Sequence, residues 1–129
     1  MKKERPISPH LQIYKPQITS MMSITHRASV VATYIMLILF AIFIFAYAFM
    51  PDLECLGWLI NSDEGVLLLR AVLIPYTFVL FFYFFSEIRH ICWDLGIGFE
   101  IETAYKSAYA IIAGTIIFAS ITWIIIFLG

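Results

Sequence analysis

The chain has 129 residues, of which 62% are hydrophobic, 17% aromatic and only 13% charged. Soluble domains carry about 25% charged residues, so this composition excludes an ordinary soluble domain. It predicts an all-α integral membrane protein in which residues 1–129 form one small domain. The net charge of −1 is uninformative. No basic stripe is interleaved with aromatic residues, which argues against a nucleic-acid partner.

The first 22 residues contain three prolines, Pro6, Pro9 and Pro16, which oppose a continuous helix. Composition alone is also typical of a disordered tail. Apolar side chains such as Leu11 nevertheless recur through this segment, and free tails are usually more polar. We therefore interpret residues 1–22 as an extended arm that packs on a partner protein.

A first transmembrane helix is predicted over about residues 23–50. No formal charge follows Arg27 until Asp52, which leaves 24 residues (28–51) to cross a bilayer. Ser23 and Arg27 are four residues apart, so they share one helix face. A hydroxyl and a guanidinium at this depth are costly without partners. They suit a lipid-soluble ligand that carries a carbonyl group.

Two further helices follow an acidic connection at residues 52–65. The second is predicted at about 66–92, and its charge-free part, 71–86, has 16 residues. This part spans about 24 Å, less than the roughly 30 Å of a bilayer core, so charged residues flanking it lie near the hydrocarbon boundary. Pro75 is interpreted as a kink or an early N-terminal proline. After a glycine-rich turn, a third helix is predicted at about 103–128.

Basic residues are distributed unevenly, with five before the first apolar run, Arg70 alone between the first two apolar runs and two around the second connection. The positive-inside rule therefore predicts that the N-terminus and the second connection face the cytoplasm or matrix, and that the C-terminus faces the other side. Cys55 and Cys92 would then lie about a bilayer apart, too far for a disulfide or a shared metal. Without four suitable thiolates or a nucleotide-binding loop, the chain can hold neither an iron–sulfur cluster nor a flavin unaided, so any electrons that it handles come from a partner.

This topology gathers two polar groups at the inner membrane face, one at the start of the first helix and one at the end of the second. The groups are Ser23, His26 and Arg27, and Glu87, Arg89, His90 and Asp94. Donors, an acid and two imidazoles beside an apolar cavity suit the binding and protonation of a quinone.

Each of these residues could also have a role that does not involve binding a ligand. The two arginines could reach lipid headgroups, and Ser23 could cap its helix. The histidines could be interfacial residues, and Asp94 a solvated turn residue. Their coincidence on one face favours the binding site.

Two motifs carry a resemblance to a known family. Residues 5–29, RPISPHLQIYKPQITSMMSITHRAS, resemble the N-terminal signature of the cytochrome b556 subunit of succinate dehydrogenase, which has Arg-Pro, a spacer and then Ser-x-x-His-Arg-x-Ser. A second family signature, Ile-Arg-His-x-x-x-Asp, is matched at residues 88–94. The resemblance covers both signatures, the three-helix layout and nearly the whole chain.

The resemblance implies a membrane-anchor subunit of complex II, part of a multi-subunit helix bundle in a bacterial cytoplasmic or mitochondrial inner membrane. It also implies three partners: a flavoprotein subunit, an iron–sulfur subunit and a second small membrane-anchor subunit. Ser23, Arg27 and Asp94 would contribute to a ubiquinone site, and His26 would lie near haem propionates. A purely structural anchor, or the anchor of a related fumarate reductase, remains an alternative.

One position departs from the family pattern. The family has an axial haem b histidine six residues before the conserved arginine, followed four residues later by a small residue. Here these positions are Tyr83 and Glu87. Tyrosine is not the usual ligand of a b-type cytochrome, and His90 lies about 10 Å further along the helix. Haem b is therefore left open, with Tyr83, Arg89 and His90 as residues near it and no firm metal ligand. Any ligands would come from another chain.

Overall fold

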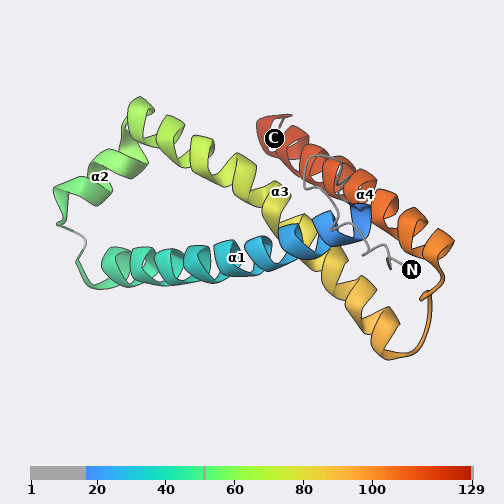
Figure 1. Ribbon diagram of the computed structural model, residues 1–129. Coiled ribbons are helices and arrows are strands. Elements are labelled where there is room, and N and C mark those ends of the chain that lie inside the picture. The colour runs from blue at the N-terminus through green and yellow to red at the C-terminus, as the bar shows by residue number, and fades with distance from the viewer. Residues whose placement is uncertain (1–16, 51, 129) are drawn as a thin grey trace, which may run out of the picture.

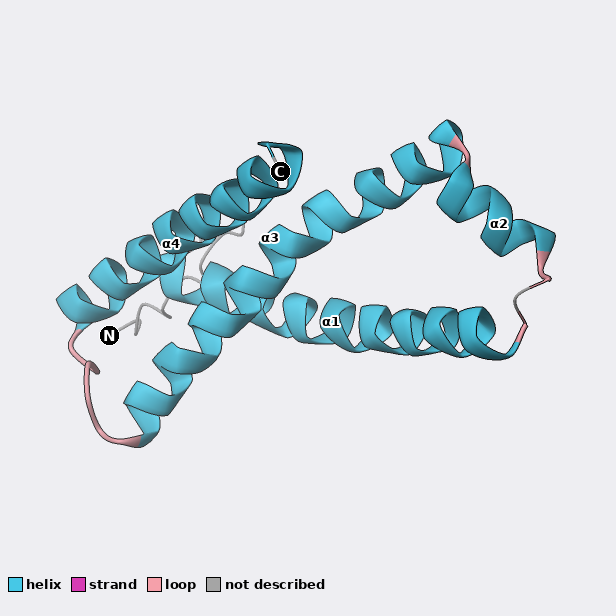
Figure 2. Cartoon of the chain, turned by 180° about the vertical axis from the view of Figure 1, so that it is seen from behind, coloured by secondary structure: helices cyan, strands magenta, loops and turns pink. Residues whose placement is uncertain are grey.

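The computed structural model describes residues 17–50 and 52–128, and this part of the chain is all-helical (Figures 1 and 2). Three helices are long and apolar enough to cross a membrane: α1 (Ile18–Phe49), α3 (Asp63–Asp94) and α4 (Ile101–Leu128). A short helix, α2 (Glu54–Asn61), connects the first two. The predicted all-α membrane fold with three membrane-spanning helices is confirmed.

The first helix begins at Ile18, five residues before Ser23. Residues 18–22 are therefore helical, and their assignment to an extended arm was wrong; residues 1–16 of that arm lie outside the described residues. Gln17 precedes the helix with extended backbone angles and makes no side-chain capping bond. Ser23 lies inside the helix and does not cap it. The helix begins two residues after Pro16 in the sequence, because no further helix breaker follows that proline in the next residues.

The acidic connection contains a helix that was not predicted from the sequence, α2, at Glu54–Asn61. Ser62 then caps α3: its hydroxyl accepts a 3.0 Å hydrogen bond from the Gly65 amide and donates to the Trp58 carbonyl at 2.6 Å. This cap satisfies one of the free amides in the first turn of a helix. Pro75 lies inside α3, so its interpretation as an early N-terminal proline was wrong.

The second connection is set by glycine. Gly96 has a φ of +79°, and the Ile97 and Gly96 amides donate to the carbonyls of Cys92 and Trp93 at 2.9 and 2.8 Å. These two bonds form a Schellman motif, which ends a helix by placing one residue in the left-handed region. The glycine-rich turn therefore stops α3 and allows α4 to return along it.

The helix α3 lies between the other two long helices, α1 and α4 (Figure 1). It crosses α1 near the N-terminal end of α1, and the two diverge toward α2 (Figures 1 and 2). α4 lies on α3 through a stripe of buried side chains, which are Ala104, Ala108, Ile111, Thr115 and Ala119. Small residues in such a stripe allow helices to approach closely in a membrane.

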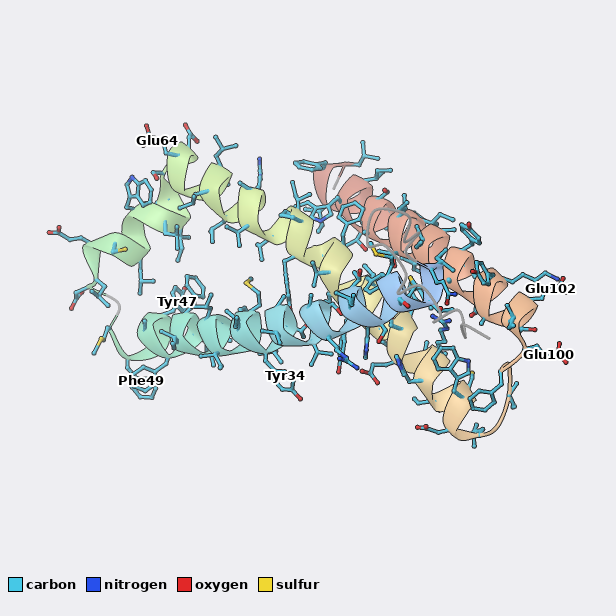
Figure 3. The ribbon with its side chains drawn as sticks, viewed as in Figure 1. Tyr34, Tyr47, Phe49, Glu64, Glu100 and Glu102 are labelled. Carbon is cyan, nitrogen blue, oxygen red and sulfur yellow. The ribbon has the colours of Figure 1, made fainter. Side chains whose placement is uncertain are left out.

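Acidic side chains mark both ends of the molecule, with Glu64 at the α2 end and Glu100 and Glu102 at the other (Figure 3). Between the ends, most large apolar side chains are exposed; Tyr34 and Phe49 of α1, for example, point away from α3 (Figure 3). Such an apolar surface is the one that a chain in a lipid bilayer presents to lipid or to neighbouring helices.

Candidate functional site

The start of α1 and the end of α3 are joined by one polar contact. His26 Nε2 lies 2.9 Å from Glu87 Oε1, although the two residues are 61 positions apart in the chain. The His26 side chain is 15% exposed and the Glu87 side chain 39% exposed. This contact therefore connects a mostly buried imidazole with a partly exposed carboxyl group.

Two further rings surround His26. The His90 ring stacks on it with centroids 4.4 Å apart, and the Tyr83 ring is nearly parallel to it at 6.1 Å. His90 Nδ1 lies 2.8 Å from the Ser86 carbonyl oxygen. Because a carbonyl only accepts hydrogen bonds, His90 Nδ1 carries a proton, and Nε2 is the remaining ring nitrogen.

Arg89 fixes the same end of α3 against α4. Its side chain is buried, Nη2 donates a 3.2 Å hydrogen bond to the Ala104 carbonyl, and the guanidinium lies 4.1 Å from the centre of the Trp93 ring. Trp93 in turn donates to the Gly98 carbonyl at 3.3 Å. A planar guanidinium can stack and donate at once, which an ammonium group cannot.

A small cavity of about 50 Å³ lies where these groups meet. Its walls are Thr19, Met22, Ser23, His26, Ser86, Arg89, His90 and Trp93. Ser86 Oγ and Arg89 Nε are buried and have no hydrogen-bond partner within the described part of the chain. A polar space of this size holds about one or two water molecules, whereas a ligand pocket is usually about 300 Å³ or larger.

The structure brings some of the predicted site residues together and leaves others apart. Ser23, His26, Arg89 and His90 line the cavity, and Tyr83 stacks beside it. Arg27 is exposed one turn after Ser23 and does not line the cavity.

Asp94 is the exposed last residue of α3 and also lies outside the cavity walls. A quinone ring that contacted both Ser23 and Arg27 would therefore lie on the open face of α1, with the cavity behind it.

Several contributors were not foreseen from the sequence as parts of the site: the bond that Glu87 makes to His26, and the cavity residues Thr19, Met22, Ser86 and Trp93. Helical spacing carried a signal for two of them. Glu87 is three residues before His90, and Trp93 is four residues after Arg89, so each pair shares a face of α3. No local pattern indicated that His26 would meet this face.

The fold and the site together define a polytopic helical membrane subunit with a polar cluster at one end of its helices. A sequence profile of the succinate dehydrogenase/fumarate reductase transmembrane subunits matches residues 1–122. The chain belongs to this family.

Individual relatives are similar in sequence to this chain over most of its length. The succinate dehydrogenase cytochrome b556 subunit of Rickettsia bellii is 33% identical over 94% of this chain and 92% of its own length. The cytochrome b556 subunit of Paracoccus denitrificans is 32% identical over 95% of this chain and 92% of its length. The succinate dehydrogenase cytochrome b560 subunit of Reclinomonas americana is 34% identical over 94% of this chain and 85% of its own length.

This membership confirms the predicted family and its complex II context. Three membrane-spanning helices in a family with bacterial and mitochondrial relatives fit an inner-membrane location. As a succinate dehydrogenase membrane subunit, the chain works with other subunits of that complex and with the bilayer.

The names of the relatives imply a b-type haem, but the contacts of this chain do not fit a haem held between its own α1 and α3. The rings of His26 and His90 stack 4.4 Å apart, which leaves no room for a macrocycle between them. His26 Nε2 bonds Glu87, and His90 Nδ1 bonds the Ser86 carbonyl.

Proposed function

We propose that this chain is the membrane-anchor subunit of a succinate dehydrogenase and that it helps to form the site where ubiquinone is reduced. An iron–sulfur subunit supplies the electrons, a flavoprotein subunit oxidises succinate, and a second small anchor subunit completes the helix bundle. The observation that carries the proposal is the placement of Ser23 on the wall of a polar cavity, one helical turn from the exposed Arg27.

The chain supplies one side of the quinone site. Its own cavity of about 50 Å³ is too small for a quinone ring, so the ring binds on the exposed face of α1 and partner subunits provide the remaining walls. Ser23 and Arg27 donate hydrogen bonds to one quinone carbonyl and stabilise the negative charge that develops on its oxygen during reduction. Asp94, at the end of α3, lies at the aqueous edge of this site.

The proposal also includes the orientation of the chain in the membrane and the source of the ligands for any haem. The N-terminus and the α3–α4 turn face the cytoplasm or matrix, as the distribution of basic residues indicates. Any haem b in the assembled complex takes its axial ligands from other chains. The direct route of electrons from an iron–sulfur cluster to the quinone does not require a haem ligand from this chain.

The test uses the purified complex carrying Ser23→Ala or Arg27→Ala. Succinate:quinone activity should fall about tenfold or more, since each variant removes roughly 1.4 kcal/mol or more of transition-state stabilisation. Succinate oxidation by an artificial acceptor should be unchanged. Thr25→Ala is the matched control, because the Thr25 hydroxyl donates to the Met21 carbonyl of its own helix at 2.9 Å. Unchanged quinone reduction in both variants would refute the site.

The purely structural anchor predicts a different result from the same variants. In that case a sister chain binds the quinone, and the substitutions lower the amount of assembled complex without altering the apparent KM or kcat for quinone. The direction of turnover is settled separately by comparing succinate oxidation with fumarate reduction, because the family includes both types of enzyme.

A further inference from the structure

The contact between α1 and α3 points to the source of a proton for the reduced quinone. We propose that His26 donates a proton to the quinone oxygen held by Ser23, and that Glu87 is the residue that positions His26 for this transfer. The inference rests on the proposed function, because it assumes that a quinone binds at Ser23.

Glu87 determines which nitrogen of His26 is free. The carboxylate accepts a hydrogen bond from Nε2 at 2.9 Å, so the Nε2 proton stays in this bond. Nδ1 has no hydrogen-bond partner within the described residues and is left to exchange a proton. A carboxylate that fixes the tautomer of a histidine and stabilises its protonated form is the arrangement of a catalytic Ser-His-Asp triad.

The groups around His26 distinguish the residue that transfers the proton from the residues that only shape the cavity. From α3 it faces the Glu87 carboxyl, the Tyr83 phenol and the His90 ring, and Arg89 lines the same cavity. Glu87 is the only carboxylate among these groups. His90 stacks on His26 at 4.4 Å, and of these two imidazoles only His26 contacts the Glu87 carboxylate. His90 and Arg89 therefore shape the cavity, and His26 carries the exchangeable proton.

The cavity supplies the replacement proton. Ser86 Oγ and Arg89 Nε are both buried and unpartnered within the described residues, and both residues line the cavity of about 50 Å³. Buried polar groups of this kind are usually satisfied by an ordered water, and the space holds about one or two waters. Ser23 and His26 line the same space, so a water there is next to the proton donor and can return a proton to it.

Proton transfer from His26 follows reduction of the quinone. Two electrons from reduced iron–sulfur clusters of the partner subunit reduce the quinone to a dianion equivalent. The N–H bond at Nδ1 of protonated His26 breaks, and an O–H bond forms at the quinone oxygen beside Ser23. His26 is left neutral, with its Nε2 proton still donated to Glu87. Cavity water, in exchange with the aqueous phase, then returns a proton to Nδ1, and the second quinone oxygen receives its proton on the partner side.

The test compares His26→Ala and Glu87→Gln in the assembled complex. His26→Ala should lower the kcat for quinone reduction about 100-fold, the usual scale of general acid catalysis, with little change in quinone KM. Added imidazole should restore part of that kcat, because the deleted ring leaves a space of its own size. Glu87→Gln, which keeps the shape but loses the charge, should lower kcat about tenfold, and Glu87→Asp should lower it less. Succinate oxidation by an artificial acceptor should be unchanged in all of them.

Glu102→Gln is the control for a lost carboxylate, since Glu102 pairs with Lys106 at 2.7 Å on the exposed surface of α4. It should leave quinone reduction unchanged. The proposal is overturned if the His26 and Glu87 variants keep the normal kcat, if they raise only KM, or if imidazole has no effect on His26→Ala.

Should His26→Ala fail to assemble, His26→Gln keeps the size of the residue and must show the same loss of kcat. Failure of the proposed function is recognised separately, because it leaves Ser23→Ala and Arg27→Ala fully active.

Discussion

Arg89 shows how a charged residue is accommodated near the end of a membrane helix. It is 7% exposed, yet its guanidinium stacks on Trp93 and donates to the Ala104 carbonyl across the α3–α4 contact. A buried charge is tolerated when it is hydrogen-bonded and covered by a polarisable surface. Arg89 therefore links the end of α3 to the start of α4 as well as lining the cavity.

We expect Arg89→Lys to destabilise the complex by about 1–2 kcal/mol, since lysine keeps the charge but loses the planar stacking and the forked donor. Thermal unfolding of the detergent-solubilised complex measures the loss. Arg70→Lys is the matched control: Arg70 is exposed, and its guanidinium lies 5.4 Å from the Phe127 ring centre. Equal effects of the two substitutions would show that the Arg89 contacts contribute nothing specific.

At the scale of elements, Gly65 sets how closely α2 approaches α3. A Cβ at this position would lie 2.5 Å from the Trp58 carbonyl oxygen and 2.6 Å from the Leu59 Cα, both backbone atoms that cannot move independently. The hydrogen bonds of Ser62 hold the same corner. The corner between the two helices therefore requires glycine for space.

A series of three alanine substitutions tests this reading of the helix contacts. Gly65→Ala should destabilise the protein by about 2 kcal/mol or more, as overpacking does. Gly114→Ala should cost less, because its Cβ would meet only the Phe85 side chain, at 3.3 Å. Gly57→Ala should be neutral or stabilise by about 0.5–1 kcal/mol, because nothing lies within 4 Å and alanine favours helix.

Loss of helical circular dichroism on heating ranks the three variants. The expected order of stability is Gly57→Ala, then Gly114→Ala, then Gly65→Ala. A Gly65 variant as stable as the Gly57 variant would mean that α2 does not pack against α3 in the membrane.

At the scale of the whole molecule, the chain buries few side chains of its own. The core is a small cluster of Met22, Ala108 and Ile111, with Phe82 and Phe85 packed against it. The half of α1 near α2 diverges from α3 and exposes apolar side chains on all sides (Figure 1). Such a helix is stable only in lipid or against other helices, as expected of a chain that forms part of a larger bundle.

The two cysteines report the proposed orientation without any engineered label. Both are free and exposed, Cys55 in α2 and Cys92 near the end of α3, at opposite ends of the molecule (Figures 1 and 2). In intact right-side-out vesicles, an impermeant maleimide should label Cys55 and spare Cys92. Inverted vesicles should give the reverse.

Cys55→Ser and Cys92→Ser variants assign each signal, and labelling after detergent permeabilisation shows that both thiols react. Labelling of Cys92 from the outer side would contradict the N-in orientation.

Local chemistry explains what could be predicted from the sequence. Runs of apolar residues long enough for a bilayer identified the three spans, because hydrophobic transfer depends on composition and length. Glycine predicted the turn after α3, because only glycine adopts a φ of +79° at Gly96 without strain. The start of α1 and the helix within the acidic connection were less predictable, since helix ends depend on weak local preferences.

The sequence by itself determined the class of protein, the number of spans and the polar residues available at one end of them. Only the tertiary structure decided that His26 meets Glu87 and stacks on His90, that Arg89 reaches α4, and that Arg27 and Asp94 stay outside the cavity. The physical reason is that the facing of two helices depends on how their side chains interlock along the whole crossing, and no local pattern encodes this.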